Sequence, residues 1–266
     1  MSLNAVKILK ISITNNSKKE ILEEIQKYLF EKSKVKSRKS KNLVIFTPNT
    51  EQIVLAQKNS HFAEVLNQAD IAIPDSVGVV WAGRVLTKNG PKTQIPGVEF
   101  MENLVQLAEN RHVPIGLIGG RDKVAVKTLE CLRKKYPGLI GWGEEKIDEA
   151  YLAKKILDTN AVIIFVALGP PKQEQLIEKL SYQLSGIRKA DRRSPITDHS
   201  SVVLMAVGGS FDIISGRLPR APVLMRTLGL EWFWRLILEP RRIFRQLALI
   251  EFVWVVLQER LFRGAK

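Results

Sequence analysis

Short apolar runs that alternate with longer segments of helical period constrain the fold of this chain more than any other feature. Two of the runs, "VIIFVAL" and "VVLMAV", are continuously apolar, which is typical of central strands covered on both faces. The alternation predicts an α/β fold with a Rossmann-like, mostly parallel sheet and helices on both faces. The six predicted strands are residues 7–13, 42–46, 71–73, 114–119, 161–168 and 201–207.

Helical periodicity fills the intervals between these runs. The predicted helices lie near residues 18–34, 50–69, 77–86, 98–111, 121–136, 148–158 and 172–184. The segment 185–200 interrupts this rhythm with charged residues, glycine and proline. We expect an exposed loop there, and a basic contact surface is the alternative.

The last part of the chain, residues 221–266, no longer alternates and predicts two or three amphipathic helices with a break near Glu239–Pro240. From Arg217 to the end of the sequence there are nine arginines and four glutamates. We therefore predict two parts: an α/β core over residues 1–220 and an arginine-rich helical appendage over residues 221–266.

The composition excludes several kinds of site. The 266 residues are 45% hydrophobic, which is enough for a substantial core. The single cysteine, Cys131, excludes an internal disulfide, and the three histidines are too scattered to predict a zinc site. No export signal or apolar run of membrane-spanning length is visible, so we expect a cytoplasmic protein. The net charge of +14 predicts an anionic partner, whether nucleic acid, a phosphorylated ligand or acidic lipid.

Polar residues follow two of the predicted strands, where parallel α/β sheets bind their ligands. After residues 42–46 come Thr47 and Asn49, which either contact a ligand or form a capping turn for a helix starting at Thr50. After residues 71–73 comes Asp75, which is either an N-cap of the next helix or a carboxylate that takes a proton.

Glycine turns follow three further strands. Gly120 opens "GRDK", whose backbone N–H groups are candidates for phosphate binding. Gly169 opens the rigid "GPPKQE" loop, which we expect to place Lys172 and Gln173 at a ligand from a helix N-terminus. After the strand at 201–207, Phe211 and Asp212 suit a planar polar group such as a base, or equally a core aromatic and a helix cap.

The sequence contains no Asp-x-Asp pair of the kind that holds a divalent metal on a sugar nucleotide. If the ligand is a nucleotide diphosphate, its charge must be neutralised in another way, and the arginine-rich C-terminal part is the candidate. We therefore predict neither a metal site nor a cofactor.

Five motifs resemble the WecG/TagA/CpsF family of glycosyltransferases in order and approximate spacing, from about residue 7 to about residue 250. They are "TPNTE", "IPDSVGVVW", "ALGPPKQE", "VGGSFDIISGRLPRAP" and "LGLEWFWRLILEPRRIFR". The resemblance implies an inverting, metal-independent transfer of N-acetylmannosamine from a UDP donor to undecaprenyl-diphosphate-linked N-acetylglucosamine. The product would be a lipid-linked disaccharide for a surface polymer such as wall teichoic acid. A different UDP-sugar donor, of the mannosaminuronic acid or glucose type, is the alternative.

The resemblance also implies roles for individual residues. Asp75 matches the proposed catalytic base. The implied substrate-binding residues are Thr47, Asn49, Gln173, Arg235, Arg242 and Arg245. Two positions depart from the family pattern: Ser76 replaces the glycine of "DG", and Gln94 replaces an arginine, with Lys92 close by.

The expected partners are the UDP-sugar, the polyprenyl-diphosphate acceptor and the anionic inner surface of the plasma membrane. Leu, Phe, Trp and Val alternate with arginine in the C-terminal part, as in interfacial helices. An oligomer interface or an ordinary docked helix is the alternative. Nucleic acid is not expected, because no recognised binding motif occurs. A sensor that binds UDP-sugar without transferring it differs from the enzyme in tolerating loss of Asp75.

Overall fold

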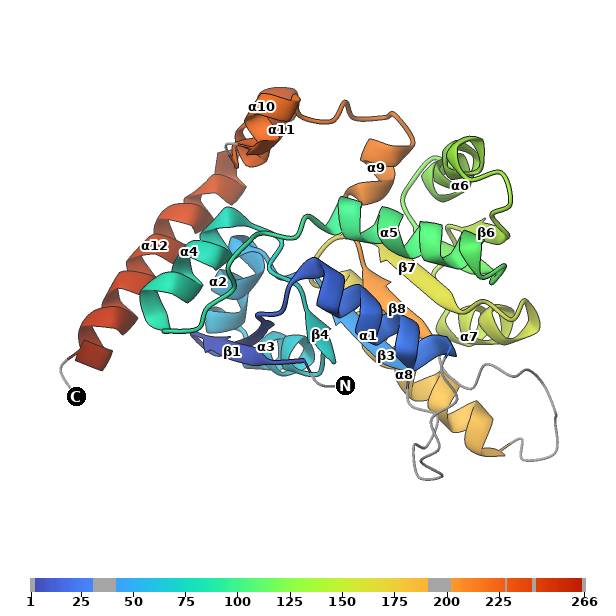
Figure 1. The fold of residues 1–266 in the computed structure, drawn as a ribbon, viewed down its shortest axis with the longest axis horizontal. Coiled ribbons are helices and arrows are strands. Elements are labelled where there is room, and N and C mark those ends of the chain that lie inside the picture. The colour runs from blue at the N-terminus through green and yellow to red at the C-terminus, as the bar shows by residue number, and fades with distance from the viewer. Residues whose placement is uncertain (1–2, 31–41, 191–201, 228, 241–242, 265–266) are drawn as a thin grey trace.

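The computed structural model describes residues 3–30, 42–190, 202–227, 229–240 and 243–264. Its centre is a parallel six-stranded sheet of order β4-β3-β8-β7-β5-β6 (Figure 1). The strands are β3 (Leu43–Phe46), β4 (Ile71–Ala72), β5 (Ile115–Gly119), β6 (Gly141–Glu144), β7 (Ile163–Ala167) and β8 (Val203–Ala206). The predicted α/β class is therefore confirmed.

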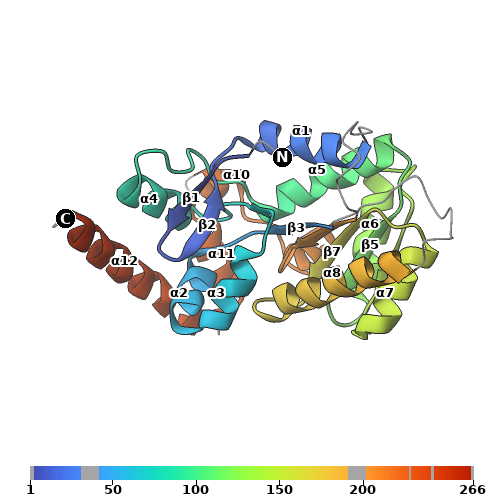
Figure 2. The same cartoon turned by 90° about the horizontal axis from the view of Figure 1, so that it is seen from below.

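Two layers of helices cover the sheet (Figure 2). Leu43 and Ile45 of β3 point into one apolar cluster, and Val44 and Phe46 point into the other, as the two-residue period of a strand requires. The first cluster lies under α1 (Lys18–Phe30), α5 (Gly97–Asn110) and α6 (Val124–Lys135). The second lies under α2 (Thr50–Lys58), α3 (Ser60–Asn67), α7 (Glu149–Asp158) and α8 (Lys172–Ala190).

The N-terminal segment differs from the prediction of one strand over residues 7–13. It forms an antiparallel hairpin of β1 (Ala5–Ile8) and β2 (Ile11–Thr14), separate from the main sheet. The turn places Leu9 at φ 55°, a left-handed conformation that leucine rarely adopts. Because the turn contains no glycine, asparagine or proline, the sequence carries no ordinary turn signal there.

Three other predictions of helices and strands were wrong. Strand β6 was missed because "GWGE" has no β-branched residue. The predicted helix over 50–69 is two helices, separated by Asn59, whose side chain accepts a hydrogen bond from the Phe62 N–H at 3.0 Å and so caps α3. Helix α8 continues to Ala190, so the expected loop over 185–200 begins as helix, and its remaining residues lie outside the described part.

A short helix, α9 (Ser210–Ile214), follows β8. The C-terminal part then forms two short helices and one long helix in its described residues: α10 (Val223–Thr227), α11 (Glu231–Leu238) and α12 (Ile243–Gly264). The break predicted near Glu239–Pro240 is confirmed, because it falls between α11 and α12. Helix α12 lies along α2 and α4 (Val77–Leu86) and inserts Phe252 and Val256 into the core (Figure 1). No helix in the described ranges is both long and apolar enough to cross a membrane.

Candidate functional site

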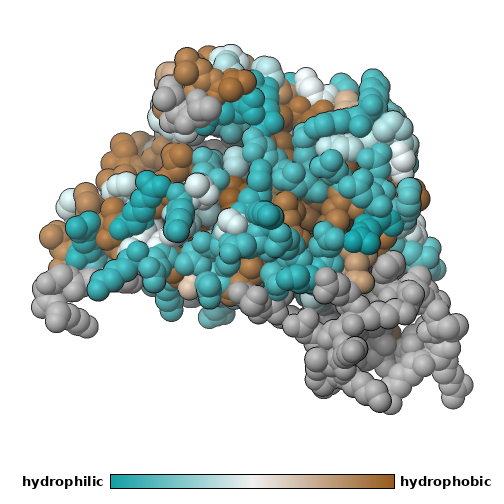
Figure 3. Space-filling model, in the orientation of Figure 1, coloured by the Kyte–Doolittle hydropathy of each residue, from teal (hydrophilic) through white to brown (hydrophobic). Residues whose placement is uncertain are grey.

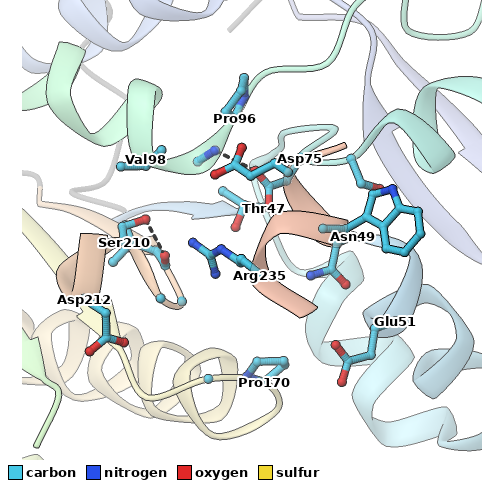
Figure 4. Close-up of a pocket in the computed structure, with 18 of the residues that line it drawn as sticks. Thr47, Asn49, Glu51, Asp75, Pro96, Val98, Pro170, Ser210, Asp212 and Arg235 are labelled. Carbon is cyan, nitrogen blue, oxygen red and sulfur yellow. Dashed lines mark hydrogen bonds between the residues drawn. The ribbon is translucent and has the colours of Figure 1, made fainter. Parts of the chain in front are cut away.

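A cleft of about 840 Å³ lies at the carboxyl ends of the parallel strands. The loops that follow β3, β4, β5, β7 and β8 form its floor and walls, and α11 forms one side (Figure 4). This is the edge at which the topology places ligands, because the strand ends meet there.

Asp75, just after β4, is fixed by a helix other than the one it precedes. Its Oδ1 accepts a hydrogen bond of 2.6 Å from the N–H of Gly97, the first residue of α5. Its backbone carbonyl accepts a hydrogen bond of 2.7 Å from Nε2 of Gln94. The cap of α4 is Ser76, whose Oγ accepts from the Val79 N–H at 3.4 Å. Asp75 is therefore not the N-cap of the helix that follows it, and its carboxylate lines the cleft.

The electrostatic environment suits Asp75 to proton transfer. Burial raises the pKa of its carboxyl to about 7, against the lowering effects of the Gly97 hydrogen bond and the positive Arg235. Negative Glu231, one turn before Arg235 on α11, raises the pKa further. A carboxyl with a pKa near 7 is substantially ionised at neutral pH and basic enough to accept a proton from a bound hydroxyl.

Arg235 is the arginine that the described structure brings to Asp75. Its guanidinium projects into the middle of the cleft, between Asp75 and Thr47 on one side and Pro170 on the other (Figure 4). It lies directly over Gly209, where a Cβ atom would come within 3.0 Å of Arg235 Nη1.

The other two predicted arginines are not placed in the cleft by the described residues. Arg242 lies outside them, and only the helical backbone of Arg245 is described. Arg235, Arg242 and Arg245 would share one face only if a single helix carried all three, with at most a kink or restart at Pro240. Because α11 ends at Leu238 and α12 begins at Ile243, Arg235 and Arg245 belong to different helices.

Thr47 and Asn49 combine structural contacts with a place in the cleft. The Thr47 hydroxyl donates to the carbonyl of Ala206 at 3.3 Å, which ties the ends of β3 and β8 together. Asn49 caps α2 in a reciprocal pair with Gln52: each side-chain oxygen accepts from the other residue's backbone N–H at 3.0 Å. The capping alternative for Asn49 is therefore confirmed, and the same residue still lines the cleft.

Gln173 is buried at the edge of the cleft, with both ends of its amide occupied. Its Oε1 accepts from the Gly208 N–H at 3.0 Å, and its Nε2 donates to Oε1 of Glu174 at 2.8 Å. Glu174 is fully buried and also accepts from Nε2 of Gln52 at 2.8 Å. Burial raises its pKa to about 7. The sequence analysis singled out Gln173 but not Glu174.

The remaining candidates divide into cleft and core. Phe211 is fully buried in the apolar cluster under α5 and α6 and is a core aromatic, as one of its two interpretations proposed. Asp212 lines the cleft and lies 3.9 Å from the Arg217 guanidinium. Three other candidates also line the cleft: Gly120, Gly169 and Lys172.

Several cleft residues were not expected from the sequence. Glu99, in the first turn of α5, forms ion pairs with two arginines: its Oε1 lies 2.7 Å from Nη2 of Arg220 and 3.7 Å from Nη1 of Arg226. The cleft-lining residues that sequence analysis missed include Glu99, Arg121, Arg217, Arg226 and Trp232. Arg121 and Arg217 gave little signal, because arginines in loops are usually just solvated, and the other three look like ordinary residues of amphipathic helices. Within the described ranges, no three His, Cys, Asp or Glu side chains are grouped so that they could hold a metal ion.

Comparison with known proteins identifies the family. The model of the glycosyl transferase WecG/TagA/CpsF family matches residues 6–266. The chain belongs to this family. A relative from Bacillus subtilis (strain 168) is 32% identical over 219 residues, 81% of this chain and 79% of its own length. Another, from Staphylococcus aureus (strain NCTC 8325 / PS 47), is 29% identical over 243 residues, 90% of this chain and 87% of its own. Both are named N-acetylglucosaminyldiphosphoundecaprenol N-acetyl-beta-D-mannosaminyltransferase.

Proposed function

We propose that this glycosyltransferase moves N-acetylmannosamine from a UDP donor to N-acetylglucosamine carried on undecaprenyl diphosphate, with inversion and without a metal ion. The observation that carries the proposal is that Asp75 and Arg235 line the same cleft of a WecG/TagA/CpsF chain, with Arg235 close enough to lower the pKa of Asp75. The names of the two relatives support the acceptor and the sugar. The product would be a lipid-linked disaccharide for a surface polymer such as wall teichoic acid.

The chemistry is a single displacement. Asp75 removes the proton of the acceptor hydroxyl as its oxygen attacks the anomeric carbon of the donor. The bond from that carbon to the diphosphate oxygen breaks on the opposite side, and UDP leaves with the electron pair, which inverts the configuration. Arg235 would stabilise the negative charge that develops on the departing diphosphate. The proton ends on Asp75.

The donor would lie along the strand ends, toward the side of the cleft that holds Asp212. Its nucleoside would reach Asp212, and its diphosphate would meet Arg235 and Lys172, all of which line the cleft. Thr47, Asn49 and Gln173 would contact the donor from the floor. The proposal includes Arg242 and Arg245, which would complete closure of the C-terminal part over the donor.

We also propose that the C-terminal helices contact the anionic membrane surface, where a polyprenyl-linked acceptor presents its sugar. Apolar side chains gather on the outer side of these helices (Figure 3). The exposed ones that do not line the cleft are Leu224, Phe233, Ile237, Leu247, Ile250, Val253, Trp254, Leu257, Leu261 and Phe262. Apolar residues beside arginine are typical of interfacial helices. We expect the wild-type protein to float with anionic liposomes and the double variant Ile250→Ser/Trp254→Ser to remain in the lower fractions. If the wild-type protein does not float but self-associates as its concentration rises, the apolar surface is an oligomer interface instead.

The test of the function is release of UDP from a panel of UDP-sugars, with and without a short-chain lipid-linked N-acetylglucosamine. Release that depends on acceptor, with N-acetylmannosamine donor preferred, supports the proposal. Preference for a mannosaminuronic acid or glucose donor would change the sugar but keep the reaction. Binding of UDP-sugar by the wild-type protein, with no transfer to the acceptor from any donor of the panel, would identify a sensor.

A further inference from the structure

Glu174 is a buried acid that the proposed displacement does not use. It lies in the first turn of α8 and is fully inaccessible to solvent. Its Oε1 accepts two hydrogen bonds of 2.8 Å, from Nε2 of Gln52 and from Nε2 of Gln173. Its Oε2 is buried and has no hydrogen-bond partner among the described residues. Burying a carboxyl group with an unpartnered oxygen costs free energy, so its position calls for an explanation.

The contacts of Glu174 join the first turn of α8 to two loops of the cleft. Gln173, in the first turn of α8, accepts from the Gly208 N–H in the loop after β8. Gln52, on the other side, accepts from the Asn49 N–H in the loop after β3. Both glutamine amides meet at one oxygen of Glu174. The chain of hydrogen bonds therefore runs from Gly208 to Asn49 through a single carboxyl group.

Glu174 determines which way both amides face. A glutamine side chain can rotate by 180° and exchange its donor and acceptor ends at little steric cost. Oε1 of Glu174 can only accept, whether the carboxyl is ionised or carries its proton on Oε2. Both NH₂ groups must therefore face Glu174, and both carbonyl oxygens must face the backbone N–H groups of Gly208 and Asn49. One hydrogen on Gln173 Nε2 then remains for a ligand in the cleft.

We propose that Glu174 is a positioning residue that orients Gln173, and through Gln52 also Asn49, for donor binding. This inference rests on the proposed function for its effect on the donor. Its structural half, the orientation of Gln173, needs no substrate. The two halves are separable, because Gly208 reports on the Gln173 side chain through its own N–H.

The test compares Glu174→Gln with Glu174→Met in the full-length protein. Glutamine and methionine are similar in length, but only glutamine keeps an oxygen that accepts from both amides. Hydrogen exchange at the Gly208 amide should be about tenfold faster in Glu174→Met, as expected for one lost hydrogen bond, and close to wild type in Glu174→Gln. Gln173→Ala is the matched control, since it removes the acceptor for Gly208 outright.

Kinetics with the UDP-sugar donor complete the test. The donor KM should rise about tenfold in Glu174→Met and stay within about threefold of wild type in Glu174→Gln. The double variant Gln173→Ala/Glu174→Met should lose less than the product of the two single effects, because Glu174 acts in part through Gln173, and any loss beyond that of Gln173→Ala runs through Gln52 and Asn49. Multiplied effects, or a Glu174→Met protein with wild-type exchange at Gly208, would overturn the inference. If wild-type protein transfers no sugar, the proposed function fails, and exchange at Gly208 still decides whether Glu174 orients Gln173.

Discussion

The Asp75 carboxylate accepts a 2.6 Å hydrogen bond from the N–H of Gly97, which opens a helix 22 residues further along the chain. The N-terminus of a helix favours a negative charge, whereas burial opposes it. Burial has the larger effect, and the pKa of the Asp75 carboxyl is about 7. One contact therefore both fixes the direction of the proposed base and keeps it able to ionise.

Replacing Asp75 by Asn should nearly abolish transfer. The amide keeps the size of the side chain but cannot take a proton, so kcat should fall by about 10²–10⁴-fold. Donor binding, measured by calorimetry, should persist. Asp148→Asn is a matched control, because Asp148 caps α7 and Asn caps equally well. Wild-type turnover by Asp75→Asn would remove Asp75 from the mechanism.

The pH dependence of kcat/KM should show an acid limb near pH 7, because Asp75 acts only when ionised. Arg235→Gln removes a positive charge that lowers the Asp75 pKa, so the limb should move to higher pH. Glu231→Gln removes a negative charge that raises it, so the limb should move to lower pH. Initial rates over pH 5–9 test both directions, and shifts of the same sign in the two variants would contradict this assignment.

Stability should fall as pH rises from about 4 to 7. Asp75 and Glu174 have folded-state pKa values of about 7, above the ordinary values of 3.8 and 4.5. The folded state therefore binds more protons than the unfolded state in this window, and the free energy of unfolding decreases until both groups are ionised. The free energy of unfolding of Asp75→Asn and of Glu174→Gln, each taken relative to wild type at the same pH, should rise by about 1–3 kcal/mol from pH 5 to pH 8. Urea unfolding at the two pH values measures the gain, and a constant difference would argue against the raised pKa values.

Gly209→Ala should impair the enzyme through Arg235. The added Cβ would lie 3.0 Å from Arg235 Nη1, and because the arginine side chain is flexible, we expect it to move rather than the backbone. Transfer should fall by roughly tenfold while the unfolding temperature changes little. Gly186→Ala is the control: its Cβ would meet nothing within 4 Å, and alanine in a helix should stabilise by about 1 kcal/mol. Full activity in Gly209→Ala would show that the position of Arg235 is not critical.

Helix α12 should contribute to the core as well as to the surface. Phe252 is fully buried, so Phe252→Ala should cost about 3–5 kcal/mol of unfolding free energy. Trp254, two residues on, is 62% exposed, so Trp254→Ala should cost less than about 1 kcal/mol. Chemical denaturation of both variants measures the difference. Equal costs would contradict this packing. Removal of the whole C-terminal part is for the same reason not a clean test of Arg235.

Regular patterns made the sheet and most helices predictable, since burial on both faces leaves continuous apolar runs such as that of β7. The hairpin turn at Leu9 and the strand "GWGE" carried no local signal, and tertiary contacts decided them. In the site, Asp75 and Arg235 were found because they belong to distinctive motifs. Glu174 was not, because its role depends on Gln52, 122 residues away in sequence.

Helix α11, which carries Arg235, lies between two attachments of the chain to the body. Before it, Arg220 and Arg226 lie at Glu99; after it, Phe252 and Val256 are buried in the core. Arg235 is therefore tethered on both sides, which keeps it at a high effective concentration beside the cleft. Each closure over a diphosphate would be an intramolecular event, with no translational entropy of association to overcome.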